Sequence, residues 1–131
     1  ATFDILLHAQ YSRLFKDESF DIVLGTEAMW LPARSLGCEA FIPGLGNVFP
    51  EICQKMYQEG IADDNEACRK TQFKVNKLRD VMYLAKSTQL AIYSMLEIRG
   101  IIKSYPRAPF IPASPEENEN IKVSLQEMGM I

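Results

Sequence analysis

Two glycine-bearing loops hold the residues that are best placed for chemistry in this chain. Gly25, Thr26 and Glu27 follow the apolar run 20–24, and a second loop runs from Gly44 to Asn47 after the short run 40–43. The glycines of the second loop invite comparison with a phosphate cradle, but their spacing fits neither a P-loop nor a dinucleotide-binding fingerprint. The loops therefore mark a site whose chemistry no short glycine motif identifies.

The remaining reactive side chains do not form a self-contained catalytic group. His8 is the only histidine and lies away from both loops, which favours a structural or solvent-facing role over that of a general base. No lysine falls on the runs 20–24 or 40–43, where a Schiff-base lysine would be held rigid and desolvated. The acidic pairs 63–64 and 116–117 are typical of helix starts, so we expect no metal site and no cofactor.

The apolar runs that precede the two loops are predicted to be parallel β-strands. A segment rich in helix formers, 28–36, separates the runs and ends at Gly37. Two strands joined by a crossover helix lie parallel, and parallel strands need covered faces and further neighbours. Because the loops after the carboxyl ends of such strands carry the chemistry, Gly25 and Gly44 should lie side by side at the mouth of a site.

The rest of the chain is predicted to be helical. The opening helix is capped by Thr2 or Asp4, and Gly60 ends the helix that begins at Pro50. Three prolines within 105–112 exclude a regular helix there. The predicted helices span 4–15, 50–60, 63–86, 89–99 and 115–128, the last with Ser114 as its cap.

Composition excludes several classes of protein. The 131 residues are 47% hydrophobic and 24% charged, with a net charge of −3, which gives no electrostatic reason to expect nucleic acid. No apolar run reaches the ~20 residues of a membrane span, and no signal peptide is visible. Cys38, Cys53 and Cys68 form no CxxC pair, which indicates free thiols in a reducing, cytoplasmic setting.

These segments resemble a known superfamily of enzymes. Residues 20–27 and 35–47, followed by Pro50 and Glu51, are similar to the C-terminal part of the dihydrodipicolinate synthase and N-acetylneuraminate lyase superfamily. The sequence Tyr-Pro-Arg-Ala-Pro at 105–109, ahead of a proline-bounded helix start, is most similar to the 2-keto-3-deoxygluconate aldolase branch, in which Tyr-Pro-Arg-x-Pro precedes the last helix. The resemblance covers essentially the whole chain.

The resemblance implies an α/β fold, a (β/α)8 TIM barrel with an added C-terminal helical unit. Strand seven would be 20–24 and strand eight 40–43. Residues 1–60 would then be the last part of the barrel, and 61–131 the helical unit. The superfamily catalyses class I aldolase chemistry through a lysine Schiff base. The branch resemblance implies cleavage of a 2-keto-3-deoxy sugar acid, such as 2-keto-3-deoxygluconate, to pyruvate and an aldehyde.

The resemblance also assigns substrate-binding positions. Gly25, Thr26 and Glu27 would contact the hydroxylated part of the substrate, and Ile42, Pro43 and Gly44 would line the site near the Schiff base. Asn47 would hold its loop. Two other roles remain open: Glu27 as a carboxylate that stabilises the following helix, and the glycines of both loops as turn residues with positive φ.

The catalytic residues of the superfamily would all precede Ala1. They are the Schiff-base lysine on strand six, a tyrosine on strand five and a hydroxyl pair on strand two, so the 131 residues alone should be inactive. The expected partners are the missing N-terminal barrel segment, a 2-oxo acid and sibling subunits of a tetramer. The alternatives are a dihydrodipicolinate synthase-like or N-acetylneuraminate lyase-like enzyme, and a helical interaction module without catalysis.

Overall fold

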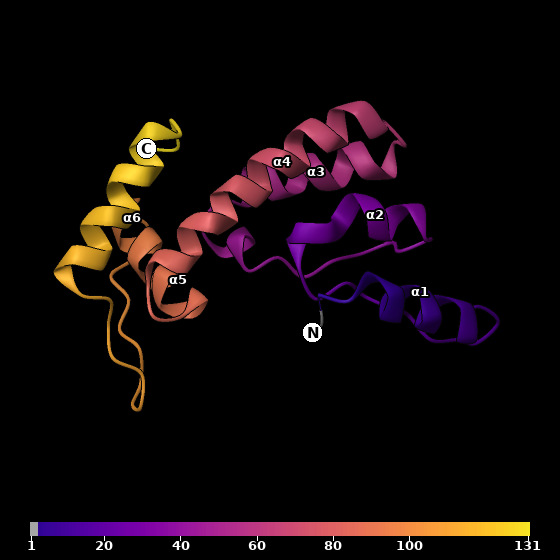
Figure 1. Ribbon diagram of the computed structural model, residues 1–131, viewed down its shortest axis with the longest axis horizontal. Coiled ribbons are helices and arrows are strands. Elements are labelled where there is room, and N and C mark those ends of the chain that lie inside the picture. The colour runs from indigo at the N-terminus through magenta and orange to yellow at the C-terminus, as the bar shows by residue number, and fades with distance from the viewer. Residues whose placement is uncertain (1–2) are drawn as a thin grey trace. The chain divides into compact units, whose positions relative to one another are not determined.

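The computed structural model describes residues 3–131, which fold mainly into helices joined by loops (Figure 1). The chain divides into two compact units, Ala1–Asn76 and Lys77–Ile131. The predicted domain boundary after residue 60 falls at the end of α3 and stays a prediction. The helices are α1 (Ile5–Leu14), η1 (Glu27–Met29), α2 (Trp30–Ser35), η2 (Leu45–Asn47), α3 (Pro50–Ile61), α4 (Asn65–Val81), η3 (Met82–Leu84), α5 (Thr88–Ile98) and α6 (Pro115–Glu127).

The opening helix begins where a local cap is available. Asp4 is the N-cap of α1, and its carboxylate accepts hydrogen bonds from the backbone N–H groups of Leu6 (2.9 Å) and Leu7 (3.0 Å). Such a cap satisfies donors that have no acceptor within the helix. One of the two predicted caps is thus confirmed, while Thr2 lies outside the described residues.

The two predicted strands are reduced to one parallel bridge. Leu24 pairs with Phe41, the Leu24 N–H donates to Ala40 O (3.0 Å), and the Ile42 N–H donates to Leu24 O (2.9 Å). The parallel direction is as predicted, but within residues 3–131 neither segment forms a β-strand. The physical reason is that a strand needs neighbours, and within this range each segment has only the other to pair with.

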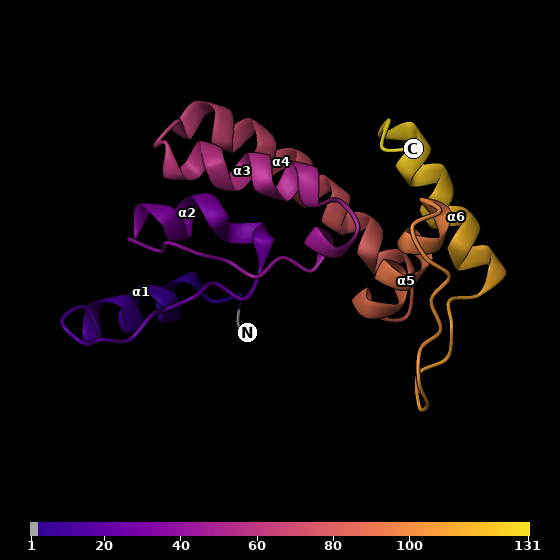
Figure 2. The same ribbon diagram turned by 180° about the vertical axis from the view of Figure 1, so that it is seen from behind.

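In the first unit, α2 packs against α3 (Figure 2). Trp30, the first residue of α2, is fully buried and donates its indole N–H to Met56 O (3.1 Å). Gly60 lies inside α3 and does not end it, contrary to the sequence-based expectation. A Cβ atom at Gly60 would lie 2.3 Å from Trp30 Nε1, so close approach of the indole explains the glycine.

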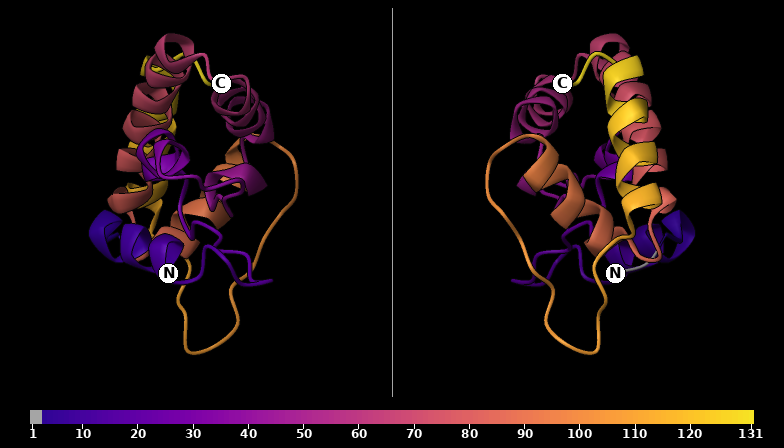
Figure 3. Two further views of the ribbon diagram at one scale, coloured as in Figure 1. Left: turned by 90° about the vertical axis from the view of Figure 1, so that its right-hand side faces the viewer. Right: turned by 90° about the vertical axis from the view of Figure 1, so that its left-hand side faces the viewer.

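The second unit packs α5 against α6, and a long irregular segment between them extends away from both helices (Figure 3). Residues 105–112 contain no helix, as the prolines predict. Ser114 and Glu117 form a capping box at the start of α6: Ser114 Oγ accepts from Glu117 N–H (3.1 Å), and the Glu117 carboxylate accepts from Ser114 N–H (2.7 Å). The cap and the proline-led start of the last helix are therefore confirmed.

The predicted apolar stripe of α4 and η3 is largely buried. Thr71, Val75, Leu78 and Met82 are each less than 5% exposed. The three cysteines are buried and free, as predicted from their odd number and spacing.

No helix within residues 3–131 is both long enough and apolar enough to cross a membrane. A cytoplasmic location stays a prediction.

Candidate functional site

The two glycine-bearing loops meet directly. Because residues 24 and 41 pair in parallel, the loops that follow them leave the same edge of the bridge. The carboxylate Oε2 of Glu27 accepts a hydrogen bond from the Gly44 N–H at 2.9 Å. The predicted juxtaposition of the loops is therefore confirmed by a contact between them.

Glu27 is a buried carboxylate at the start of a helical segment. Thr26, 3% exposed, is the N-cap of η1, and its hydroxyl oxygen accepts from the Ala28 N–H at 3.1 Å. Glu27 follows as the first residue of η1 and is 0% exposed. A carboxylate in the first helical turn is stabilised by the helix dipole, in agreement with the structural role that the sequence left open. Its side chain points to Gly44 rather than to solvent.

The charge of Glu27 is felt by a buried thiol on α3. Burial, followed by the negative charges of Glu27 and Glu51, raises the pKa of the Cys53 thiol from 9.0 to about 12. Cys53 is therefore a neutral thiol at physiological pH and is not an activated nucleophile.

Gly44 is held on both sides of its backbone. Its N–H donates to Glu27, and its carbonyl oxygen accepts from Asn47 Nδ2 at 3.0 Å. The expectation of a positive φ is wrong for Gly44, which is right-handed helical with φ −62° and ψ −44°. A Cβ at Gly46 would lie 2.7 Å from Cγ of Pro43, so close contact explains that glycine. Asn47 holds its loop, as predicted.

The other predicted site residues lie nearer to solvent. Gly25 is exposed, and Ile42 is 69% exposed. Pro43 is half-buried and lines a hollow of about 270 Å³ together with Phe41, Gly46, Pro50, Cys53, Gln54 and Tyr57. The structure thus brings Thr26, Glu27 and Gly44 together as a connected group, with Gly25, Ile42 and Pro43 around it.

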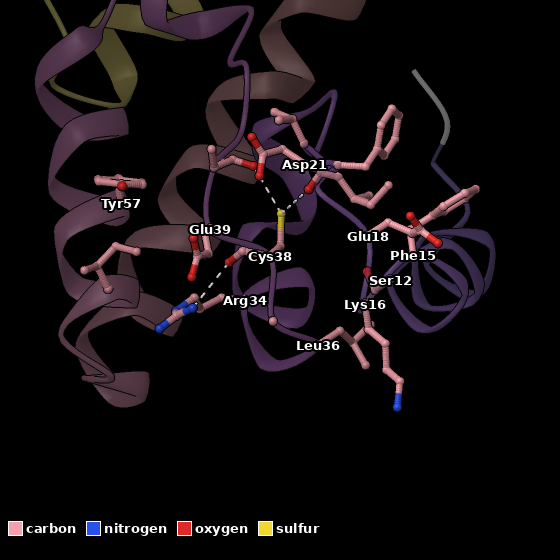
Figure 4. Close-up of a pocket in the computed structure, with 16 residues that line it drawn as sticks. Ser12, Phe15, Lys16, Glu18, Asp21, Arg34, Leu36, Cys38, Glu39 and Tyr57 are labelled. Carbon is pink, nitrogen blue, oxygen red and sulfur yellow. Dashed lines mark hydrogen bonds between the residues drawn. The ribbon is translucent and has the colours of Figure 1, made fainter.

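A larger hollow of about 900 Å³ lies at the opposite ends of the two extended segments (Figure 4). It is lined by residues 20–23 and 36–40 and by side chains from α1, α2 and α3, but by none of the six predicted site residues. Within it, the Cys38 thiol donates to Ala40 O (3.1 Å) and Ile22 O (3.6 Å). Because chemistry in parallel α/β folds lies at the carboxyl ends of strands, we place the candidate site at the two loops.

Sequence reasoning missed one polar residue that touches the candidate site. Gln72 on α4 is 4% exposed and donates a hydrogen bond to the backbone oxygen of Glu27 at 2.8 Å. The available signal was its place beside the apolar stripe of α4, four residues after the buried Cys68 and three before the buried Val75. A polar side chain on the buried face of a helix needs an internal partner.

Metal ligands are not part of this arrangement. Within residues 3–131 no group of three or more histidine, cysteine, aspartate or glutamate side chains is placed to hold a metal ion. His8 is 5% exposed and lies on α1, outside both loops. The candidate site therefore consists of backbone groups and of the side chains that fix them.

Comparison with known proteins gives the class of the fold. A dihydrodipicolinate synthase structure from Bacteroides thetaiotaomicron matches 97% of the chain and 44% of its own chain, with 24% identity and a TM-score of 0.90. The KD(P)GA structure from T. tenax matches 99% of the chain and 45% of its own, with 18% identity and a TM-score of 0.85. The chain therefore shares the fold of part of a dihydrodipicolinate synthase-like TIM-barrel superfamily.

Sequence comparison gives the family. The model of the dihydrodipicolinate synthetase family matches residues 4–128, so the chain belongs to that family. The 4-hydroxy-tetrahydrodipicolinate synthase of Methanospirillum hungatei is 29% identical over 109 residues, which are 83% of this chain and 37% of the relative. The enzyme of the same name from Methanosarcina barkeri is 25% identical over 115 residues, 88% of this chain and 39% of the relative.

These matches refine the predicted resemblance. The superfamily is confirmed, whereas KD(P)GA and the Sulfolobus solfataricus 2-keto-3-deoxygluconate aldolase variant, at 18% and 17% identity, are more distant structural neighbours. The chain spans about two fifths of the length of the curated relatives that it matches.

Proposed function

We propose that this chain is the closing part of a TIM-barrel lyase that works through a lysine Schiff base and releases pyruvate from a 2-keto-3-deoxy sugar acid. The observation that carries the proposal is the hydrogen bond between Glu27 and Gly44, which joins the loops at the carboxyl ends of two parallel segments. That edge is where parallel barrels place their chemistry. Membership of the dihydrodipicolinate synthetase family supports the same class.

The proposed reaction is covalent catalysis. A desolvated lysine amine, outside residues 1–131, condenses with the C2 carbonyl of the 2-oxo acid and expels water. A base takes the proton of the C4 hydroxyl group, the C3–C4 bond breaks, and its electron pair moves into the protonated imine. The aldehyde leaves, the resulting enamine is protonated at C3, and hydrolysis frees pyruvate and the lysine.

This chain contributes one wall of the site in that reaction. Gly25 and Ile42 are the exposed members of the predicted set and meet the substrate from the two loops. Thr26 and Glu27 are buried and act on substrate choice by shaping the first loop, since their oxygens accept hydrogen bonds from Ala28 and Gly44. Pro43 and Gly44 line the site near the Schiff base.

The particular sugar acid is proposed from the segment 105–109, whose sequence resembles the 2-keto-3-deoxygluconate aldolase branch. A second candidate is a condensation in the manner of dihydrodipicolinate synthase. The observation in its favour is that the curated relatives at 23–29% identity carry the name 4-hydroxy-tetrahydrodipicolinate synthase. Both candidates use a pyruvate imine and differ in the aldehyde partner. Tetrameric assembly is part of the proposal for either candidate.

The test is reductive trapping on the complete protein. Pyruvate with borohydride should attach a reduced pyruvyl group to one lysine, and peptide mapping should place that lysine outside residues 1–131. The 131-residue chain treated in the same way is the control and should gain no mass. An adduct on a lysine within these residues, or none on the complete protein, would contradict the proposal. The second result is the one expected of an interaction module.

Steady-state rates then separate the two candidates. Retro-aldol cleavage of a panel of 2-keto-3-deoxy sugar acids should be faster than condensation of pyruvate with aspartate semialdehyde if the first candidate holds. The reverse order selects the synthase.

A further inference from the structure

The side-chain amide of Gln72 uses all of its hydrogen-bonding capacity toward the candidate loops and its own helix. Its Nε2 donates to Glu27 O at 2.8 Å and to Asn76 Oδ1 at 2.9 Å, and its Oε1 accepts from the Leu31 N–H at 3.1 Å. Glu27 O needs a donor and the Leu31 N–H needs an acceptor, so only this orientation of the amide satisfies both. With 4% exposure, solvent does not replace these bonds.

The bond to Leu31 compensates for a missing helix cap. The first N–H groups of a helix have no acceptor within it, and a polar N-cap side chain usually supplies one. At α2 the N-cap is Met29, which makes no side-chain hydrogen bond. Gln72 provides the acceptor from α4 instead. The start of α2, and the turn η1 before it, are therefore fixed by a residue that lies 41 positions further along the chain.

A continuous path of hydrogen bonds leads from Gln72 to the second loop. Gln72 fixes the backbone of Glu27, and the side chain of the same residue accepts from the Gly44 N–H at 2.9 Å. Asn47 holds the other side of Gly44 through its carbonyl oxygen. The position of the Gly44 peptide thus depends on where α4 holds Glu27.

We infer that Gln72 is a positioning residue of the site formed by the two loops. It acts through Glu27 to set the Gly44 backbone, and it touches no substrate atom. The inference rests on the proposed function only for what the site does. The mechanical part, from Gln72 to Gly44, concerns this chain alone.

Two variants separate the bonds. Gln72→Met keeps the length of the side chain and removes all three hydrogen bonds. Gln72→Glu keeps an acceptor for Leu31 and removes both donors. The matched controls are Thr71→Val, a buried neighbour on the same helix, and Gln58→Met, the same change at an exposed position of α3.

The readout is hydrogen exchange of the Gly44 amide, followed by NMR on the 131-residue chain and normalised to the urea midpoint of each variant. We expect exchange at Gly44 to become about tenfold faster in Gln72→Met and several-fold faster in Gln72→Glu, and to stay unchanged in both controls. Equal acceleration in Thr71→Val would show that only general loosening is measured, and would overturn the inference.

A measurement on the unchanged chain keeps the inference testable if Gln72→Met fails to fold. The side-chain amide protons of Gln72 should exchange slowly and show nuclear Overhauser contacts to the Leu31 amide. Rapid exchange without that contact would refute the proposed role.

Activity forms a separate arm, in the complete protein. Gln72→Met should lower kcat/KM for the sugar acid about tenfold while pyruvate is still trapped by borohydride, and both controls should keep the wild-type value. Undiminished kcat/KM in Gln72→Met would overturn the positioning role. Failure of the unchanged protein to trap pyruvate would instead refute the proposed function, and the exchange result at Gly44 would still decide the link from Gln72.

Discussion

Replacing Gly60 by alanine tests the packing that places the start of α2. The added Cβ would lie 2.3 Å from Nε1, 2.9 Å from Cε2 and 3.2 Å from Cζ2 of Trp30. These atoms belong to the ring of a fully buried side chain, so the indole must move, and its 3.1 Å hydrogen bond to Met56 O breaks.

The magnitude follows from three terms. Overpacking a core costs about 1–3 kcal/mol. A buried donor without its acceptor costs about 1–3 kcal/mol more. Alanine instead of glycine inside a helix returns about 1 kcal/mol. We therefore expect Gly60→Ala to lower the free energy of unfolding by roughly 3 kcal/mol.

Urea unfolding followed by circular dichroism measures this loss. Gly100→Ala is the control, because a Cβ there has no atom within 4 Å and its cost comes only from the positive φ of 67°. The indole is tested by the double variant Trp30→Phe with Gly60→Ala, in which a smaller ring should reduce the cost of the alanine by more than 1 kcal/mol, roughly the coupling expected of residues in contact. A Gly60→Ala chain as stable as the wild type, or a cost that does not change with Trp30→Phe, would refute the reasoning.

Three further predictions concern the site and α6. The pKa of Cys53 is about 12 in the folded chain against an ordinary 9.0, so the folded thiol keeps a proton that the unfolded chain releases, and stability should be full below pH 9 and fall by up to ~1.4 kcal/mol per unit as pH rises toward 12; urea midpoints should show this slope, and Cys53→Ala should flatten it. Glu27→Ala removes the acceptor of the Gly44 N–H and should cost about 1–3 kcal/mol in urea unfolding, while thiol alkylation rates measured against pH should reveal a lower pKa for Cys53; an unchanged Cys53 profile would disprove the electrostatic link. Ser114→Ala breaks the capping box with Glu117 and should cost about 0.5–2 kcal/mol, and unchanged amide exchange in the first turn of α6 would argue against it.

The helical parts of the fold follow from local patterns in the sequence. Ser114 announces α6 through a cap that needs only residues within the same turn, and Asp4 does the same for α1. The apolar spacing of α4 predicted the burial of Val75 and Leu78 because a helix repeats its faces every 3.6 residues. Such features are local and are therefore legible in one sequence.

The remaining features depend on distant contacts. Gly60 reads as a helix stop, and only the indole of Trp30, 30 positions earlier, shows why a glycine lies inside α3. Gln72 reads as an ordinary polar residue until α2 is placed beside it.

The candidate site was predicted to the same degree. The family resemblance marked the loop of Glu27 and Gly44, and the parallel geometry correctly brought the two together. The burial of Glu27 was not predicted, because it depends on how the surrounding elements enclose the loop. The substrate role assigned to it stays a prediction.

The lone rung between Leu24 and Phe41 has a consequence for handling the chain. On the outer side of each extended segment, the part of the chain from 3 to 131 supplies no further strand. Backbone groups at such a lip accept any extended polypeptide that arrives, whether it is a complementary fragment or a second copy. Colloidal behaviour at high concentration is thus governed by a few main-chain atoms around the rung, and a short peptide that occupies the lip would act as a solubiliser.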